Sequence, residues 1–253
     1  MGKLAQKIAL ITGANSGIGF TTAEEFLKEG ATVIITGRRK DAIEAAAAQL
    51  GDGAIPFTAD SANLNDLEQL ANFVKNKFGK LDIIFSNAGI AKFLPVSEVT
   101  PEAFDETMNI NFKGSYFLAQ KLLPLMTNGG AITFNTSICN QVGMPTSSLY
   151  SSSKGALSAF ARTLATEVAP QGIRVNCVSP GTINTTIQSK LGLTPEMLEI
   201  FNRSLSGKTL LQRQGKAIEI ARTVVFLSSD DAGYITGVEI PVDGGYMNNP
   251  GDR

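Results

Sequence analysis

Tyr150 and Lys154 are the two residues whose types and spacing most directly suggest chemistry in this chain. They stand four positions apart at the beginning of an expected helix, so the phenol and the ammonium group lie on one helix face. An unperturbed phenol has a pKa of about 10, and a nearby cation in a partly dry site lowers that value. Such a tyrosine can pass a proton to or from a substrate oxygen. Because this spacing is common, the pair needs further support from the rest of the chain.

A glycine-rich segment from Thr12 to Gly19 provides the first support. It follows an expected strand and opens an expected helix, and it reads Thr-Gly-Ala-Asn-Ser-Gly-Ile-Gly. Small residues let the backbone approach a pyrophosphate, and a helix N-terminus presents free amide groups to its charge. The alternative is a tight turn without a ligand, but the strand-turn-helix context favours a dinucleotide. The candidate contacts are Gly13, Asn15, Ser16, Gly17, Ile18 and Gly19.

The second expected strand ends in a basic turn, Gly37-Arg38-Arg39-Lys40. In dinucleotide-binding folds an acidic residue near this position holds the adenosine ribose, whereas arginine accommodates a 2′-phosphate. Gly37 stands where the acidic residue would be, and guanidinium groups bind phosphate in a bidentate manner. The turn therefore predicts NADP as the cofactor, bound by Arg38 and Arg39. NAD, with the charges merely solvated, is the alternative.

The composition excludes several classes of protein. The 253 residues include no histidine and two cysteines, which rules out a Ser-His-Asp triad and a zinc tetrad, so we expect no metal site. With 22 basic and 23 acidic residues the chain has no global field for nucleic acid or an anionic membrane. No apolar run approaches the ~20 residues of a membrane span, and the first residues lack a secretion signal. We expect a cytoplasmic protein.

Short β-branched runs alternate with helical patterns along the chain. Continuously apolar strands separated by helices indicate a parallel sheet covered on both faces, and we expect one doubly wound α/β domain over residues 1–253. The expected strands are Ile8–Thr12, Thr32–Thr36, Ile55–Thr58, Leu81–Phe85, Ala131–Asn135 and Ile173–Val178. The expected helices are Gly17–Lys28, Asp41–Leu50, Leu64–Phe78, Pro101–Met126 and Leu149–Val168.

The segment at about 182–216 interrupts this alternation. It contains no clear strand, and Thr194-Pro195-Glu196 predicts the start of a helix, with a cap, a proline at the first position and an acid in the first turn. Long segments of this kind inside a compact domain are usually functional, so we predict a lid over the substrate. A plain surface excursion is the alternative.

Seven motifs occur in the order and spacing of the short-chain dehydrogenase/reductase family, which the chain resembles from about Lys7 to Tyr246. They are Thr12–Gly19, Asn87-Ala88-Gly89, Asn111, Ser137, Tyr150 with Lys154, Pro180-Gly181 and Asp243-Gly244-Gly245. Together they are highly specific. The resemblance implies a Rossmann-like, doubly wound parallel sheet of about seven strands with helices on both faces.

The resemblance also implies roles for the catalytic residues. Tyr150 resembles the general acid/base, and Lys154 the residue that lowers its pKa and holds the nicotinamide ribose. Ser137 resembles the residue that hydrogen-bonds the substrate oxygen, and Asn111 the residue that supports a water reaching Lys154.

Further residues match the cofactor-binding positions of the family. Asp60, followed by Ser61, stands after the third strand at the position that contacts adenine. Asn87, Ala88 and Gly89 correspond to the lining of the cofactor cleft. The residues that match the segment closing over the nicotinamide and its phosphates are Pro180, Gly181, Ile183 and Thr185. Taken singly, several of these positions could be helix caps or turns.

The side chains expected around the substrate are mostly apolar, as in most small-molecule pockets. They predict a neutral, moderately hydrophobic ketone or secondary alcohol, reduced rather than oxidised if the cofactor is NADP. Their alternative role is to seal the core. The set is Phe93, Leu94, Ile138, Gln141, Val142, Met144, Leu149, Ile187, Leu191, Leu193, Met197 and Phe201.

Three other functions compete with this interpretation. A 3-oxoacyl-[acyl-carrier-protein] reductase-like enzyme is disfavoured because the segment 126–130 is uncharged, where relatives that dock the carrier protein tend to be basic. A methyltransferase requires an acidic residue where Gly37 stands. A non-catalytic dinucleotide sensor has no need of Ser137, Tyr150 and Lys154 together.

The expected helices Pro101–Met126 and Leu149–Val168 carry more apolar positions than one sheet face needs. Similar family members pair through these helices. We therefore predict a homotetramer.

Overall fold

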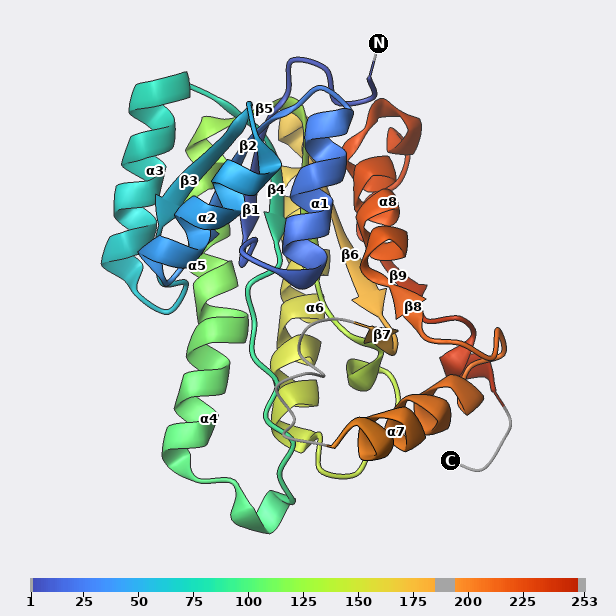
Figure 1. The fold of residues 1–253 in the computed structure, drawn as a ribbon. Coiled ribbons are helices and arrows are strands. Elements are labelled where there is room, and N and C mark those ends of the chain that lie inside the picture. Colours follow the sequence, from blue (N-terminus) through green and yellow to red (C-terminus); the bar gives the residue numbers. More distant parts are fainter. Residues whose placement is uncertain (1, 185–193, 250–253) are drawn as a thin grey trace.

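A parallel sheet of seven strands runs through the centre of the molecule (Figure 1). The computed structural model describes residues 2–184 and 194–249. In spatial order the strands are β3 (Ala54–Thr58), β2 (Thr32–Gly37), β1 (Ile8–Thr12), β4 (Leu81–Ser86), β5 (Met126–Asn135), β6 (Arg174–Pro180) and β9 (Glu239–Val242). All neighbouring strands are parallel, which confirms the predicted Rossmann-like α/β fold.

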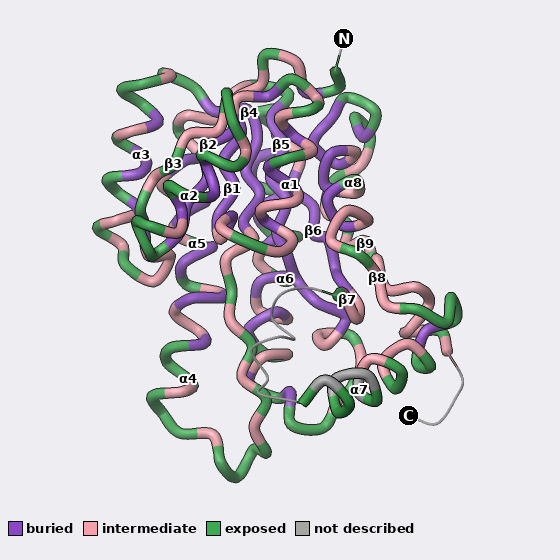
Figure 2. The backbone as a smooth tube through the Cα atoms, viewed as in Figure 1, coloured by how far each residue is buried: buried purple, intermediate pink, exposed green. Residues whose placement is uncertain are grey.

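Helices cover both faces of this sheet, and its inner strands are buried, whereas the edge strands β3 and β9 are only partly buried (Figure 2). One layer of core contains α1 (Gly17–Lys28), α2 (Lys40–Leu50) and α8 (Ala217–Ser228). The other contains α3 (Leu64–Phe78), α5 (Gly114–Leu122) and α6 (Ser148–Val168). Successive strand residues point to opposite faces, so Leu10 of β1 packs in one layer while Ala9 and Ile11 pack in the other. This burial on both faces explains why the strands are continuously apolar.

The helix predicted over Pro101–Met126 is wrong as a single element. The structure has α4 (Pro101–Met108), a π-helical turn at Asn109–Lys113 and then α5, followed by a short 3₁₀ turn at Leu123–Leu125. Pro124 lies in the last of these turns, and proline has no amide proton to continue an α-helix. Met126 already belongs to β5, which is longer at its beginning than predicted.

The segment after β6 contains two very short strands that the sequence did not predict. β7 (Ile183–Asn184) and β8 (Gly215–Lys216) pair in parallel to form a separate two-stranded sheet. Strands of two residues are too short to show a hydrophobic period, which is why they were missed. Between them, α7 (Pro195–Gly207) begins where predicted, and the Thr194 hydroxyl accepts a hydrogen bond from the Met197 amide at 3.2 Å.

Asp82 is a buried carboxylate at the amino-terminal ends of the central strands, 4% exposed. It accepts hydrogen bonds from the Ile8 amide at 2.8 Å and the Thr127 hydroxyl at 2.9 Å, and it lies 3.2 Å from the Lys80 ammonium group. Burial raises the pKa of this carboxyl, but the hydrogen bonds from Ile8, Thr127 and Lys80 outweigh burial and hold its pKa below the usual range. Asp82 is therefore ionised, and its carboxylate connects β1, β4 and β5 through hydrogen bonds.

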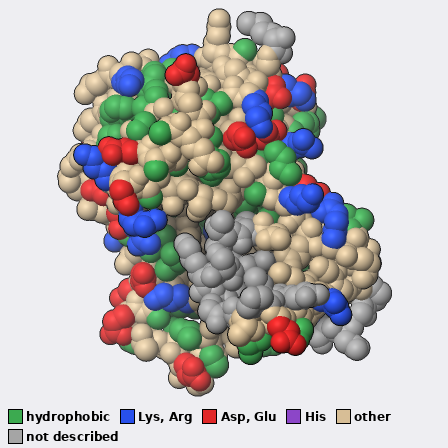
Figure 3. All heavy atoms as spheres, viewed as in Figure 1, with side chains coloured by type: hydrophobic (Ala, Val, Ile, Leu, Met, Phe, Trp, Pro, Cys, Tyr) green, Lys and Arg blue, Asp and Glu red, His purple; other side chains and the backbone are tan. Residues whose placement is uncertain are grey.

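The surface carries charges of both signs, and on the face shown in Figure 3 the acidic and basic side chains are interspersed. Within residues 2–184 and 194–249, no helix combines the length and the apolar character needed to cross a bilayer. The same described ranges contain no group of three or more His, Cys, Asp or Glu residues suited to hold a metal ion.

Candidate active site

A cleft of about 1050 Å³ opens where the central strands end. It lies beside the point at which the strand order reverses between β1 and β4, where open α/β sheets commonly bind ligands. Of the site residues predicted from the sequence, it is lined by Gly13, Asn15, Ser16, Gly17, Ile18, Arg38, Arg39, Asp60, Ser61, Asn87, Ala88, Gly89, Ser137, Tyr150, Lys154, Pro180, Gly181 and Ile183. Gly19 and Asn111 lie behind its walls, and Thr185 is outside the described residues.

The glycine-rich loop packs so closely that two of its positions have no space for a side chain. Gly13 has a φ of 64°, and a Cβ there would lie 2.9 Å from the Cα of Ala88. A Cβ on Gly19 would lie 2.5 Å from the carbonyl oxygen of Gly13. Ser16, the N-cap of α1, makes no side-chain capping bond, and the first turn of α1 contains no acidic residue. The backbone amides at this helix start, part of the cleft wall, thus suit a pyrophosphate.

A chain of amide side chains connects this loop to Lys154. The Asn87 side chain donates to the carbonyl oxygens of Thr12 at 2.9 Å and Gly13 at 3.2 Å. Asn135 in turn donates to the Asn87 side-chain oxygen at 2.8 Å, and Lys154 Nζ donates to the backbone oxygen of Asn135 at 2.7 Å. The network fixes the ammonium group of Lys154 at the carboxyl end of β5. Sequence reasoning missed Asn135; the available signal was a polar residue ending an apolar strand.

Asn111 lies in the π-helical turn between α4 and α5 and is fully buried. Its side chain accepts from the Ile90 amide at 2.8 Å and donates to the Ile90 carbonyl at 2.9 Å and to Ser153 Oγ at 3.0 Å. Gly89 of the cleft wall lies against it, since a Cβ on Gly89 would lie 3.2 Å from Asn111 Oδ1 and 3.4 Å from Lys154 Nζ. The side chains of Asn111 and Lys154 therefore both contact the same glycine of the cleft wall.

Tyr150 and Lys154 face the same part of the cleft from the first turns of α6. Lys154 Nζ lies 5.8 Å from the centre of the Tyr150 ring, and the Phe93 ring packs edge-on against that ring at 5.7 Å. Ser137, just after the end of β5, lines the same cleft, close enough to the phenol to affect its pKa. Ser137, Tyr150 and Lys154, which the sequence predicts to act together, therefore line the same cleft, although they are up to 17 positions apart in the sequence.

The pKa of Tyr150 is shifted upward, opposite to the direction expected from the neighbouring cation. Burial raises the pKa of the phenol to about 12, the Cys139 thiol acts in the same direction, and Ser137 only partly offsets them. Burial also lowers the pKa of Lys154 to about 8. Desolvation is therefore the largest cause, and the Tyr150 phenol keeps its proton at neutral pH.

The basic turn forms part of the cleft wall. Arg38 and Arg39 follow β2 with exposed side chains and belong to the cleft lining, whereas Gly37 is buried. Asp60 lies nearby after β3, where one of its carboxylate oxygens accepts from the Ala62 amide at 2.9 Å. Asp60 thus lines the cleft and also caps a turn. Both the expected contact with adenine and the alternative role as a cap are compatible with this position.

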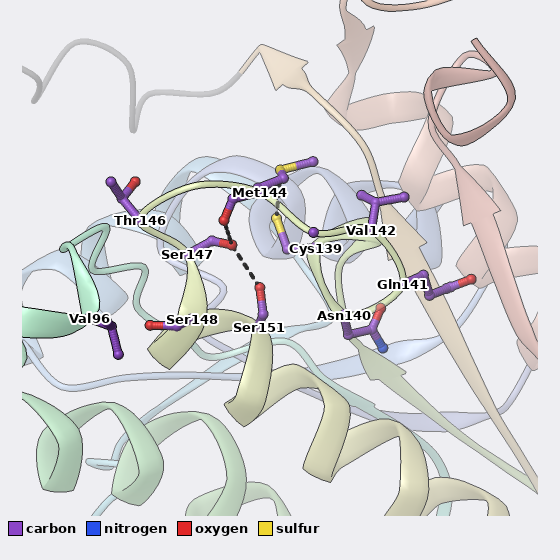
Figure 4. Close-up of a pocket in the computed structure, with 11 residues that line it drawn as sticks. Val96, Cys139, Asn140, Gln141, Val142, Met144, Thr146, Ser147, Ser148 and Ser151 are labelled. Carbon is purple, nitrogen blue, oxygen red and sulfur yellow. Dashed lines mark hydrogen bonds between the residues drawn. The ribbon is translucent and has the colours of Figure 1, made fainter. Parts of the chain in front are cut away.

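A smaller pocket of about 550 Å³ lies beside the cleft, between the loop after β5 and the start of α6 (Figure 4). Of the predicted substrate-contacting residues, it is lined by Gln141, Val142 and Met144. Ile138 and Leu149 are buried and line neither of the two pockets. The predicted positions Ile187, Leu191 and Leu193 and the side chain of Phe201 are outside the described residues.

Comparisons with known proteins identify the family of the chain. The family model described as "Enoyl-(Acyl carrier protein) reductase" matches residues 13–247. The oxidoreductase asL5 of Sarocladium schorii is 37% identical over 96% of this chain and 96% of its own. Tetrahydroxynaphthalene reductase of Pyricularia oryzae is 35% identical (96% and 90%), and the human dehydrogenase/reductase SDR family member 4 is 34% identical (96% and 88%). The chain belongs to the short-chain dehydrogenase/reductase family of oxidoreductases, a membership that implies NAD or NADP as cofactor.

Proposed function

We propose that the protein is an NADP(H)-dependent oxidoreductase acting on a neutral, moderately hydrophobic ketone or secondary alcohol. The observation that carries this proposal is the convergence of Ser137, Tyr150 and Lys154 in the cleft that Arg38 and Arg39 also line. NADP, when bound, supplies or accepts the hydride at the carbonyl carbon. The glycine-rich loop and the start of α1 would hold its pyrophosphate, and the two arginines its 2′-phosphate.

Each catalytic side chain has a defined task in this proposal. In the reductive direction the O–H bond of Tyr150 breaks and its proton passes to the substrate oxygen, while Ser137 donates a hydrogen bond to the same oxygen. Lys154, held by the Asn135 carbonyl, stabilises the phenolate that remains. A phenol that keeps its proton at neutral pH can begin the reductive reaction as a proton donor.

The substrate class is proposed from the walls around Tyr150. Phe93 packs on the Tyr150 ring, and Val142 and Met144 line the pocket beside it, so a substrate there would meet apolar side chains next to polar ones. One relative is named as a reductase of tetrahydroxynaphthalene, a neutral aromatic compound. We also propose that residues 1–253 form one domain, that the segment at about 182–216 acts as a lid, and that the protein is cytoplasmic.

A panel of carbonyl compounds, with NADPH oxidation followed at its absorbance band, tests this function. We expect turnover with neutral cyclic or aromatic ketones. The panel should include 3-oxoacyl and enoyl thioesters, both free and linked to acyl carrier protein, because the matching family model carries that description. Preference for the carrier-linked thioesters would favour the carrier-protein reductase. Tight NADPH binding without turnover on any member would favour a sensor.

We further propose that the protein is a homotetramer. The proposal is based on an aromatic surface formed by α4, α5 and α6. Phe104 and Tyr116 are 47% and 38% exposed, and the Tyr116 ring lies 4.4 Å from that of Phe160. Exposed aromatic clusters of this kind commonly mark protein interfaces. Light scattering coupled to size-exclusion chromatography should give the mass of four chains at micromolar concentration. The mass of a single chain would contradict the proposal.

A further inference from the structure

Glu239, on the edge strand β9, reaches past β6 to the end of β5. Its Oε1 accepts hydrogen bonds from Thr136 Oγ1 at 2.5 Å and from Asn140 Nδ2 at 3.0 Å. Thr136 directly precedes Ser137, and Asn140 ends the short 3₁₀ turn that follows it. One carboxylate oxygen therefore joins the two sides of the segment that carries Ser137.

The second oxygen of Glu239 connects the same segment to helix α6. Oε2 accepts from Ser158 Oγ at 2.6 Å, and Ser158 Oγ accepts from Arg162 Nη1 at 2.9 Å. Tyr150 lies on the same helix, two turns before Ser158. The carboxylate thus bridges the segment that presents Ser137 and the helix that presents Tyr150.

Ser137 is held directly within its own turn, where its carbonyl oxygen accepts from the Asn140 amide at 3.1 Å. Its backbone is extended, with a φ of −170°, and its Oγ accepts a rather long bond of 3.3 Å from the Cys139 amide. On the other side, the Val178 carbonyl accepts from the Thr136 amide at 2.9 Å and also, at 2.9 Å, from the Thr136 hydroxyl that it shares with Glu239, but no strand pairing continues through the 3₁₀ turn. The direction of the Ser137 hydroxyl consequently depends on what holds Thr136 and Asn140.

We propose that Glu239 is a positioning residue that sets the orientation of Ser137 relative to Tyr150. The inference rests on the proposed function, in which Ser137 hydrogen-bonds the substrate oxygen. A carboxylate is suited to the task because it offers two acceptor oxygens to three donors, Thr136, Asn140 and Ser158. Glutamine keeps one such acceptor and can donate to Ser158, whereas alanine removes both connections.

A double-mutant cycle between Glu239 and Ser137 tests the proposal. We expect Glu239→Ala to lower kcat on the order of tenfold or more, because small displacements of a positioned group are costly. The Kd for NADPH should stay within about twofold, and Glu239→Gln should restore most of the rate. In the Ser137→Ala background the same Glu239→Ala change should have less than about a twofold effect, since the group it positions is gone.

Amide hydrogen exchange gives a second measurement that does not depend on turnover. Exchange in residues 136–141 should be faster in Glu239→Ala than in the wild-type protein, and nearly unchanged in Glu239→Gln. Asp82→Asn is the matched control, because Asp82 is also a carboxylate with several hydrogen-bond donors but lies at the opposite ends of the strands. It should lower stability without changing kcat.

The possible outcomes separate the inference from the function on which it rests. An equal loss of rate from Glu239→Ala in both backgrounds, or unchanged exchange in residues 136–141, overturns the positioning role while the proposed function stands. A wild-type protein that reduces no carbonyl compound overturns the proposed function, and with it the role of Glu239 in positioning Ser137 for catalysis. If Glu239→Ala does not fold, Asn140→Ala removes one connection alone, and it should show the same dependence on Ser137 with a smaller loss of kcat.

Discussion

Replacing Tyr150 with phenylalanine is expected to lower kcat by a factor of about 10²–10⁴ while the Kd for NADPH stays within about twofold. Phenylalanine keeps the ring, and with it the packing against Phe93 and the position above the Lys154 ammonium group. Only the O–H group is lost, and this group is the proposed proton donor to the substrate oxygen. Steady-state kinetics with the best ketone of the panel, together with fluorescence titration of NADPH, measures both quantities.

Tyr116→Phe is the matched control for this experiment. Tyr116 lies on α5, outside the cleft lining, and its ring contacts other aromatic rings. The same loss of one hydroxyl there should leave kcat unchanged. If Tyr150→Phe also keeps full activity, the proton must come from another group and the proposed mechanism is wrong. If it loses NADPH binding in parallel with activity, Tyr150 acts mainly in forming the cofactor site.

The elements that the sequence predicted well are those determined by short-range signals. The strands β1 to β6 of the central sheet are rich in apolar residues, so their positions could be predicted to within a few residues without any knowledge of the neighbours. The edge strand β9 was not predicted, because Glu239 and Pro241 interrupt its short apolar run. The start of α7 also followed from local chemistry, because Thr194 caps it and Pro195 occupies the first position. The break between α4 and α5 was missed because an apolar helical period continues through the π-helical turn.

The parts of the site that could not be predicted depend on contacts between distant segments. Lys154 is held by the backbone oxygen of Asn135, and backbone acceptors leave no trace in residue type. Glu239 meets Thr136 across 103 positions of sequence, so no motif connects them. The pKa of Tyr150 was predicted from its charged neighbour alone, whereas burial by the surrounding fold is the dominant effect. Motif order therefore locates the cleft, and the folded structure supplies the network within it.

The preference for NADPH over NADH is expected to depend strongly on Arg38. We expect Arg38→Ala to raise the Kd for NADPH about 10- to 150-fold while that for NADH changes little, because a hydrogen-bonded charge pair contributes about 1.5–3 kcal/mol. Lys40→Ala is the matched control. Lys40 is also exposed and stands two positions after Arg38, but it does not line the cleft, and its ammonium group lies 3.8 Å from the Glu44 carboxylate. Its loss should therefore change the Kd values for NADPH and NADH slightly and equally. Equal effects of Arg38→Ala on both cofactors would remove the argument for NADP.

A variant that reverses the cofactor preference tests the role of this turn more strictly than a variant that only loses the preference. A Cβ on Gly37 would lie 3.5 Å from Asn15 Oδ1 and 3.5 Å from the Ile43 side chain, which are ordinary contacts, so Gly37→Asp can be accommodated. The new carboxylate would stand where NAD-binding relatives of this fold hold the ribose hydroxyls, and it would repel a 2′-phosphate. The double variant Gly37→Asp, Arg38→Ala is therefore expected to bind NADH more tightly than NADPH. If it still prefers NADPH, the 2′-phosphate is recognised somewhere other than at this turn.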